Sequence, residues 1–80
     1  MSIRWEYRFV RCQHYNGRWR PALLNAEPVE DFENGPDIAE YSNRIGSEGW
    51  EMVTVSVLSD SEGKASEFRA FFKRQIAEPD

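Results

Sequence analysis

The chain has 80 residues and a mass of 9.4 kDa, which allows one domain covering residues 1–80. Apolar residues make up 40 % of it and charged residues 30 %, a balance that excludes a disordered tail. No apolar run approaches the roughly 20 residues that cross a bilayer, and no apolar signal-peptide core follows Met1. The single cysteine, Cys12, excludes an internal disulfide framework and fits a reducing compartment. We therefore expect a cytoplasmic globular domain that does not associate with membranes.

The net charge of −4 is unevenly distributed along the chain. Residues 1–25 carry +4, from five arginines and one acid, whereas residues 26–51 carry −7 and residues 52–80 carry −1. Overall acidity argues against a dedicated nucleic-acid binder, which usually has a basic excess. An arginine cluster on one face of the fold remains open.

The first periodic segment, residues 3–14, has the pattern of a strand. Charged positions alternate with apolar ones, and this period of two predicts a strand with one buried face. The apolar positions on that face are Ile3, Trp5, Tyr7 and Phe9.

A hairpin is predicted next, because Asn16-Gly17 separates two strand-like runs and both residues tolerate positive φ. The second strand is expected over residues 18–24. Pro21 cannot donate a ladder hydrogen bond, so this strand should lie at a sheet edge. Residues 25–35 are acidic and interrupted by Pro28, which predicts a surface loop.

A helix is predicted from Pro36 to about Glu48, since proline suits a first helical position. Its apolar stripe, at i, i+3 and i+7, consists of Ile38, Tyr41 and Ile45. Gly46 in the last turn should be tolerated because the backbone packs closely against a sheet there. Gly49 should supply a left-handed end to the helix.

Two more strands are predicted, over residues 50–59 and 66–75. In the first, one face should hold Val53, Val55 and Val57, and the other Trp50, Met52, Thr54 and Leu58. In the second, one face should hold Phe68, Ala70 and Phe72, and the other Arg69, Phe71 and Lys73.

These elements predict an α+β fold of two layers, with one helix packed on an antiparallel sheet of three to four strands. The order is β-β-α-β-β or β-α-β-β. One short helix covers one sheet face only, although several strands carry apolar residues on both faces. An uncovered aromatic face indicates a partner, a second subunit or a ligand.

Three segments together resemble a small bacterial and phage family, domain of unknown function 4177. They are Trp5-Glu6-Tyr7-Arg8-Phe9-Val10, the central Gly46-Ser47-Glu48-Gly49-Trp50-Glu51-Met52-Val53, and the closing Ala70-Phe71-Phe72-Lys73-Arg74. The chain departs from the family at Ser42, where leucine is usual, and in a longer stretch from Gln13 to Asn34. The resemblance supports the fold and implies no catalytic residue.

No catalytic constellation is found. Cys12 and His14, two apart on one strand, would share a face, but free cysteine usually packs as a hydrophobe. These are the only soft metal ligands, and a structural zinc site needs four. The acids Glu30, Asp31 and Glu33 lack the spacing of a calcium loop. We therefore expect no enzyme activity, no metal and no cofactor.

Two binding functions remain. An anionic ligand, a nucleotide or single-stranded nucleic acid could bind an arginine and aromatic sheet face. The residues for that site are Arg4, Arg8, Arg69, Phe71 and Lys73. Cross-strand pairs with Glu6 and Glu67 on a solvated face are the competing interpretation.

The function that we favour is a self-associating protein-interaction module, because aromatics (11 of 80 residues) and arginines are enriched at interface cores. A homodimer would bury the open sheet face or join edge strands, and an external protein partner is also possible. The expected interface residues are Val10, Trp19 and Phe71, although a core position is the favoured interpretation for Trp19.

Overall fold

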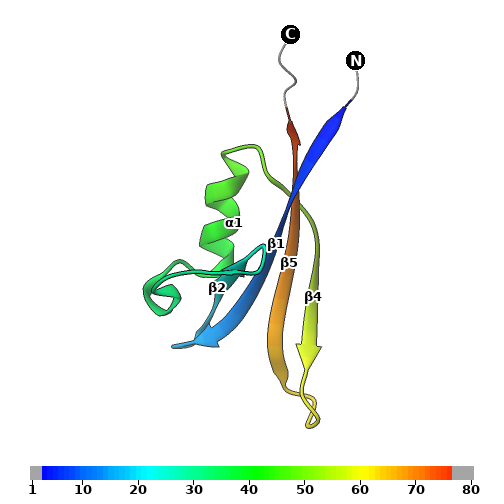
Figure 1. Cartoon of the computed structure of the whole chain (residues 1–80). Coiled ribbons are helices and arrows are strands. Elements are labelled where there is room, and N and C mark those ends of the chain that lie inside the picture. Colours follow the sequence, from blue (N-terminus) through cyan, green and yellow to red (C-terminus); the bar gives the residue numbers. More distant parts are fainter. Residues whose placement is uncertain (1–2, 77–80) are drawn as a thin grey trace.

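The computed structural model describes residues 3–76 and is an elongated α+β domain with extents of 52 × 26 × 20 Å (Figure 1). The elements in chain order are β1 (Arg4–Tyr15), β2 (Arg18–Leu24), β3 (Glu27–Pro28), the 3-10 helix η1 (Phe32–Asn34), α1 (Ile38–Gly46), β4 (Glu51–Ser59) and β5 (Ala65–Ile76). The predicted class is confirmed, with five strands in place of three to four.

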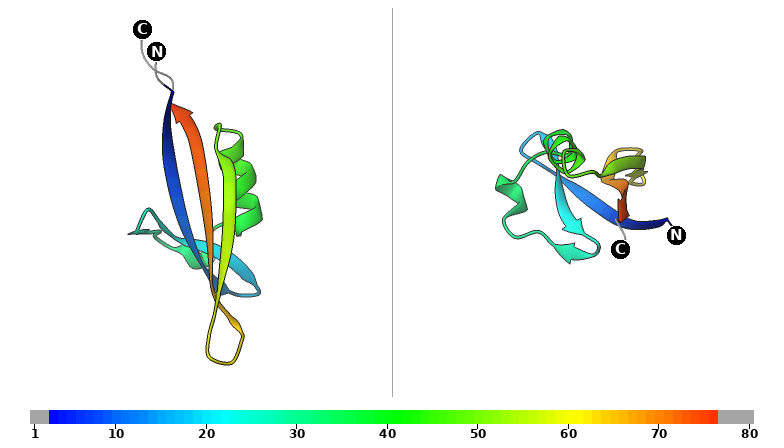
Figure 2. Two further views of the ribbon diagram at one scale, coloured as in Figure 1. Left: turned by 90° about the vertical axis from the view of Figure 1, so that its right-hand side faces the viewer. Right: turned by 90° about the horizontal axis from the view of Figure 1, so that it is seen from above.

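The strands form one antiparallel sheet in the order β3-β2-β1-β5-β4. The first and last strands, β1 and β5, are therefore neighbours at its centre. The α-helix α1 lies against one face of the sheet, and the other face has no α-helix over it in the described residues (Figure 2). We call these the helix face and the open face. The one α-helix in residues 3–76 is too short to cross a membrane.

The hairpin between β1 and β2 forms as predicted. Asn16 and Gly17 have φ of 53° and 81°, and the flanking Tyr15 and Arg18 are paired. β3 pairs with β2 only at Leu23 and Leu24, so Pro21 lies on a part of β2 that has no outer neighbour in the described ladder. The predicted edge position of the strand is wrong, because β3 lies outside β2, although Pro21 itself lies outside the β2–β3 pairing.

The segment from residue 25 to residue 35 is more structured than the predicted loop. It contains β3 and η1, and Asn25 and Ala26 form the turn into β3 with φ of 50° and 69°. Asn25 suits such a turn, whereas alanine seldom adopts positive φ, so composition gave no indication of a third strand here.

Helix α1 is shorter than predicted because it begins after a capping box rather than at Pro36. The Asp37 carboxylate accepts from the Glu40 amide, and the Glu40 side chain accepts from the Asp37 amide. The helix ends at Gly46, and Gly49 has the expected positive φ, 98°. The explanation for Gly46 is wrong, because a Cβ there would meet no described atom within 4 Å.

The core lies between α1 and the centre of the sheet. Tyr41 and Ile45 of the predicted stripe are buried, and Ile38 packs against them. The remaining buried members of the cluster are Val10, Cys12, Trp50, Ala70 and Phe72.

The buried face of β1 is opposite to the one predicted. Val10 is 1 % exposed and Cys12 is fully buried, whereas the odd positions face away from the helix. Those odd residues, from Ile3 to Phe9, are 41 to 68 % exposed. The small residues Cys12 and Ala70 let Tyr41 and Ile45 approach the sheet, which the bulky aromatic face of β1 would not allow.

The faces of β4 also differ from the prediction, because the strand has a bulge. Met52 pairs with Phe72 and Thr54 with Phe71, so one extra residue, Val53, stands between them. The bulge places Met52 on the helix face together with Val55 and Val57, while Thr54 and Leu58 lie on the open face. In β5, the two predicted faces are confirmed.

Candidate functional site

The most exposed of the longer strands is β4. It is the last strand in the sheet order, and every one of its residues is exposed. From Met52 to Ser59 it carries no charged residue and no proline. Natural edge strands are commonly protected by such residues. Its exposed large apolar side chains are Met52, Val53, Val55, Val57 and Leu58.

The backbone of β4 offers hydrogen-bonding groups at defined positions. Backbone groups alternate in direction along a strand, and the N–H and C=O of Phe9 bond to Asn25 on one side of β1. The N–H and C=O groups of Arg8, Val10 and Cys12 therefore face the opposite side, toward β5. The same alternation turns the groups of Arg69 and Phe71 toward β4. Val55 and Val57 therefore direct their N–H and C=O groups outward, away from β5.

A shallow groove separates α1 from β4 on the helix face. It has a volume of about 330 Å³ and is lined by both elements and by Phe68. Ser42, at the position where the resembled family has leucine, turns its hydroxyl back to the Ile38 carbonyl at 2.6 Å. The short side chain does not reach β4, so Met52 and Val55 keep about half of their surface exposed.

The sheet has a second free edge along the first half of β1. β2 pairs with β1 only from Val10 to Tyr15. At Phe9, Asn25 takes the place of a strand residue: the Phe9 amide donates to Asn25 Oδ1 at 2.8 Å, and the Asn25 amide donates to the Phe9 carbonyl at 2.8 Å. Beyond it, Trp5 and Tyr7 direct their backbone groups to the same side, where the described ladder has no strand.

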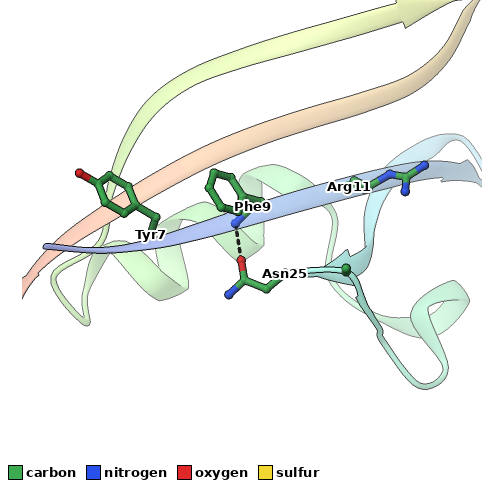
Figure 3. Close-up of a pocket in the computed structure, with 5 residues that line it drawn as sticks. Tyr7, Phe9, Arg11 and Asn25 are labelled. Atoms are coloured by element: carbon green, nitrogen blue, oxygen red, sulfur yellow. Dashed lines mark hydrogen bonds between the residues drawn. The ribbon is translucent and has the colours of Figure 1, made fainter.

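A hollow of about 490 Å³ lies beside this free edge, on the open face (Figure 3). Its walls are Tyr7, Phe9, Arg11, Asn25 and Ala26. The first three project from successive odd positions of β1, and Asn25 reaches from the β2–β3 turn to the backbone of Phe9 (Figure 3). Tyr7 and Phe9 are each about half exposed, so the hollow has an aromatic wall that solvent reaches.

The open face also carries cationic side chains. Arg11 and Arg69 both bond to Glu67, at 2.8 Å and 2.7 Å, and Lys73 Nζ lies 4.6 Å from the centre of the Trp5 ring. Hydrogen bonds from Arg11 and then from Arg69 hold the pKa of Glu67 below its ordinary value. Because this one carboxylate serves two guanidinium groups, part of the positive charge near Phe9 and Phe71 stays uncompensated.

The five residues predicted for the anion site do not share one face. Arg4 pairs with Ile76 and Arg8 with Phe72, on the helix face, whereas Arg69, Phe71 and Lys73 lie on the open face. Arg8 donates to the Tyr41 hydroxyl at 2.7 Å, and its guanidinium lies 4.5 Å from the centre of the Trp50 ring. The single-face arrangement is therefore wrong, and Arg8 has a structural contact instead.

The three residues predicted for an interface also divide. Val10 is buried in the core, which removes it from any surface. Trp19 is half-buried and packs beside Phe68 and His14, at ring distances of 6.2 Å and 5.3 Å. Only Phe71 reaches the open face, where its ring meets Phe9 at 5.6 Å.

Cys12 and His14 lie on the helix side of β1, opposite Pro21 and Trp19. Burial raises the pKa of the Cys12 thiol to about 12, so the thiol stays protonated at neutral pH. Across residues 3–76, no group of three or more histidine, cysteine or acidic side chains is placed to hold a metal ion.

Sequence reasoning raised the joining of edge strands but identified neither of these two free edges as a site. For β4 an indication was available, because eight consecutive residues without charge or proline are unusual in an edge strand. For β1 none was available, since its free half depends on where β2 ends.

Comparisons with protein-family models, with curated proteins and with solved structures find no match to this chain. The resemblance to domain of unknown function 4177 therefore stays a prediction.

Proposed function

We propose that this protein is a non-catalytic interaction module that forms a homodimer by pairing the β4 strands of two copies. The observation that carries the proposal is the outer edge of β4, where Val55 and Val57 present free backbone groups and exposed side chains. Between the bulge at Val53 and the irregularity at Leu58 and Ser59, an uncharged edge of this kind favours pairing with another strand.

The register of the dimer follows from the strand geometry. In an antiparallel pair centred on Ser56, Val55 of one copy exchanges both backbone hydrogen bonds with Val57 of the second copy. Because β4 has no charge between Met52 and Ser59, no like charges face each other across the seam.

Pairing in this register also covers apolar surface. The two-fold axis is then perpendicular to the sheet, so both helices lie on the same side. Val55 of one copy meets Val57 of the second on the side of the helices, and Met52, opposite Asp60 of the second copy, lies beside the groove that Ser42 leaves open. The dimer thus buries side chains that a single copy leaves about half exposed.

The test is the oligomeric state of Val57→Lys, measured by native mass spectrometry and sedimentation equilibrium beside the parent protein. Val57 is 51 % exposed, so lysine there does not disturb the core of a single copy. We expect a dimer for the parent protein and a monomer for the variant, with the dissociation constant raised at least about 100-fold.

The matched control is Ile3→Lys, which likewise replaces an exposed β-branched residue by lysine, just before β1. It should leave the dimer intact. A parent protein that stays monomeric at high micromolar concentration contradicts the proposal, and so does a dimer that survives Val57→Lys.

A second candidate, binding of an anionic ligand with a flat ring, is supported by one observation. The open face gathers Arg11, Arg69 and Lys73 around the Phe9–Phe71 ring pair. Stacking on the rings with phosphate at the arginines is how nucleotides and single strands are held. Titration with a short single-stranded oligonucleotide tests it: binding that weakens steeply with salt and is lost in Arg69→Ala supports it. Absence of binding at low salt rules it out.

A further inference from the structure

We infer that the free edge of β1 binds an extended peptide from another protein as an added strand, with a large apolar side chain of that peptide in the hollow beside Tyr7 and Phe9. This site is separate from the β4 edge and is independent of the homodimer. Strand addition of this kind takes its affinity from backbone hydrogen bonds and its specificity from pockets for alternate side chains.

The backbone of β1 identifies the occupant as a polypeptide in extended form. Trp5 and Tyr7 each direct an N–H and a C=O group to the side where β2 has ended. Asn25 already satisfies the equivalent groups of Phe9, with both hydrogen bonds at 2.8 Å. An added strand would repeat at Tyr7 and Trp5 the exchange that Asn25 makes at Phe9.

The hollow identifies the side chain that such a peptide needs. Successive side chains of a strand alternate between the faces of the sheet, so the peptide residue opposite Tyr7 lies on the open face. There it borders the hollow of about 490 Å³ with its aromatic wall of Tyr7 and Phe9. A large aliphatic or aromatic side chain fits this space and covers the half-exposed rings.

The charge near the hollow and the length of the edge restrict the sequence and the length of the peptide. Arg11 lines the hollow, shares the Glu67 carboxylate with Arg69 and keeps about half of its side chain exposed, which favours an acidic residue in the peptide. The β2–β3 turn at Asn25 and Ala26 closes the free edge at Phe9. A short segment therefore fits better than a long strand of a second copy, which would meet this turn.

The test begins with a phage-displayed library of random octapeptides, panned on the purified monomeric Val57→Lys variant so that the β4 seam does not compete. We expect a consensus with one large apolar residue and an acid at the end of the peptide nearer Arg11, away from Glu6. The consensus peptide is then synthesised and added to isotope-labelled protein, and the hydrogen exchange of individual backbone amides is measured by NMR.

The exchange pattern separates strand addition from simple coverage of the rings. In the free protein, the Trp5 and Tyr7 amides should exchange fast and the Glu6 and Arg8 amides slowly, because the latter two bond to β5. Added peptide should protect Trp5 and Tyr7 and leave Glu6 and Arg8 as they were.

Side-chain variants test the hollow. Tyr7→Ser should lower the affinity for the peptide about tenfold or more, since it removes one aromatic wall of the hollow. Tyr15→Ser is the matched control, because Tyr15 is equally exposed on the same strand and lies outside the hollow. It should leave the affinity unchanged.

Three results would overturn the inference. One is a library that yields no consensus, and another is a consensus peptide whose binding leaves the Trp5 and Tyr7 amides exchanging fast. The third is protection of those two amides in the free monomer, which would mean that the edge is already occupied. Failure of the dimer test leaves these readouts unaffected, so the two proposals fail separately.

Discussion

The two faces of the sheet carry similar amounts of aromatic and apolar side chain, but only one of them is covered by the α-helix. On the helix face, the small residues Cys12 and Ala70 leave room for α1. The Tyr41 ring of α1 lies 6.4 Å from the Phe72 ring of β5. On the open face, Phe9 and Phe71 meet edge to face at 5.6 Å and solvent reaches both. Side-chain size, rather than apolar character, decides which face accepts the helix.

The α-helix leaves much of the sheet uncovered. The helix covers only the middle of its face, over β1 and β5, so the side chains of β4 stay exposed on both faces. The open face has aromatic rings and charged groups but no second layer within residues 3–76. The surfaces for which we propose binding therefore lie where the single α-helix does not reach.

The strongest test of the comparison is Phe72→Ala beside Phe71→Ala, two neighbours that point to opposite faces. Phe72 is 2 % exposed in the core, so its truncation should lower the free energy of unfolding by about 3–5 kcal/mol. Phe71 is only partly buried, so its truncation should cost about 1 kcal/mol. Denaturant unfolding of both variants measures the difference.

A cost for Phe71→Ala equal to that for Phe72→Ala would show that the open face is packed in solution. That result would be expected only if a second layer covers it. Making both alanine variants in the Val57→Lys background removes any contribution of the proposed β4 seam.

A smaller effect is expected at Arg8, which the sequence placed in an anion site and the structure places beside the core. Arg8 donates to Tyr41 and lies over Trp50, so Arg8→Ala should lower the free energy of unfolding by about 2 kcal/mol. Arg4→Ala is the matched control on the same strand and face, and its exposed side chain should matter by less than about 0.5 kcal/mol.

Thermal unfolding of the two arginine variants at one salt concentration checks this pair. Equal and small losses would mean that the contacts of Arg8 with Tyr41 and Trp50 contribute nothing net to stability. The structural role assigned to Arg8 would then be wrong.

Much of the fold could be predicted because its indications are local. Asn16-Gly17 marks the hairpin, the spacing of Ile38, Tyr41 and Ile45 marks the helix, and alternation marks β5. The covered face of β1 could not be predicted, since alternation divides a strand into two faces without indicating which one meets a helix. The bulge at Val53 has no local indication either, and it reversed the first part of β4.

The candidate sites depend on pairing, which a single sequence leaves open. Arg4 and Arg8 could share a face with Arg69 only in a register that the observed pairing of Arg8 with Phe72 excludes. The free half of β1 depends on the turn at Asn25 and Ala26, and alanine gave no reason to expect a turn. Of these features, only the run without charge or proline in β4 could be recognised in the sequence.

The smallest effect concerns charge on the open face. The pKa of Glu67 lies below its ordinary value because Arg11, and then Arg69, donate hydrogen bonds to the ionised carboxylate. A carboxyl whose pKa is lowered by folding stabilises the folded state above its unfolded pKa, and this contribution is lost as pH falls through the folded pKa. Glu67→Gln should therefore lower the free energy of unfolding at pH 7, by less than about 1 kcal/mol because the site is near solvent.

The pH dependence identifies the cause of that loss. The gap between parent and Glu67→Gln should be constant from neutral pH down to about pH 5, and it should shrink below about pH 4.5 as Glu67 becomes protonated. Glu62→Gln, in the exposed β4–β5 turn, is the matched control and should show no such gap. If the difference in free energy of unfolding persists at about pH 3, the Glu67 side chain contributes through packing. The charge of Glu67 would then not stabilise the two arginines on the open face.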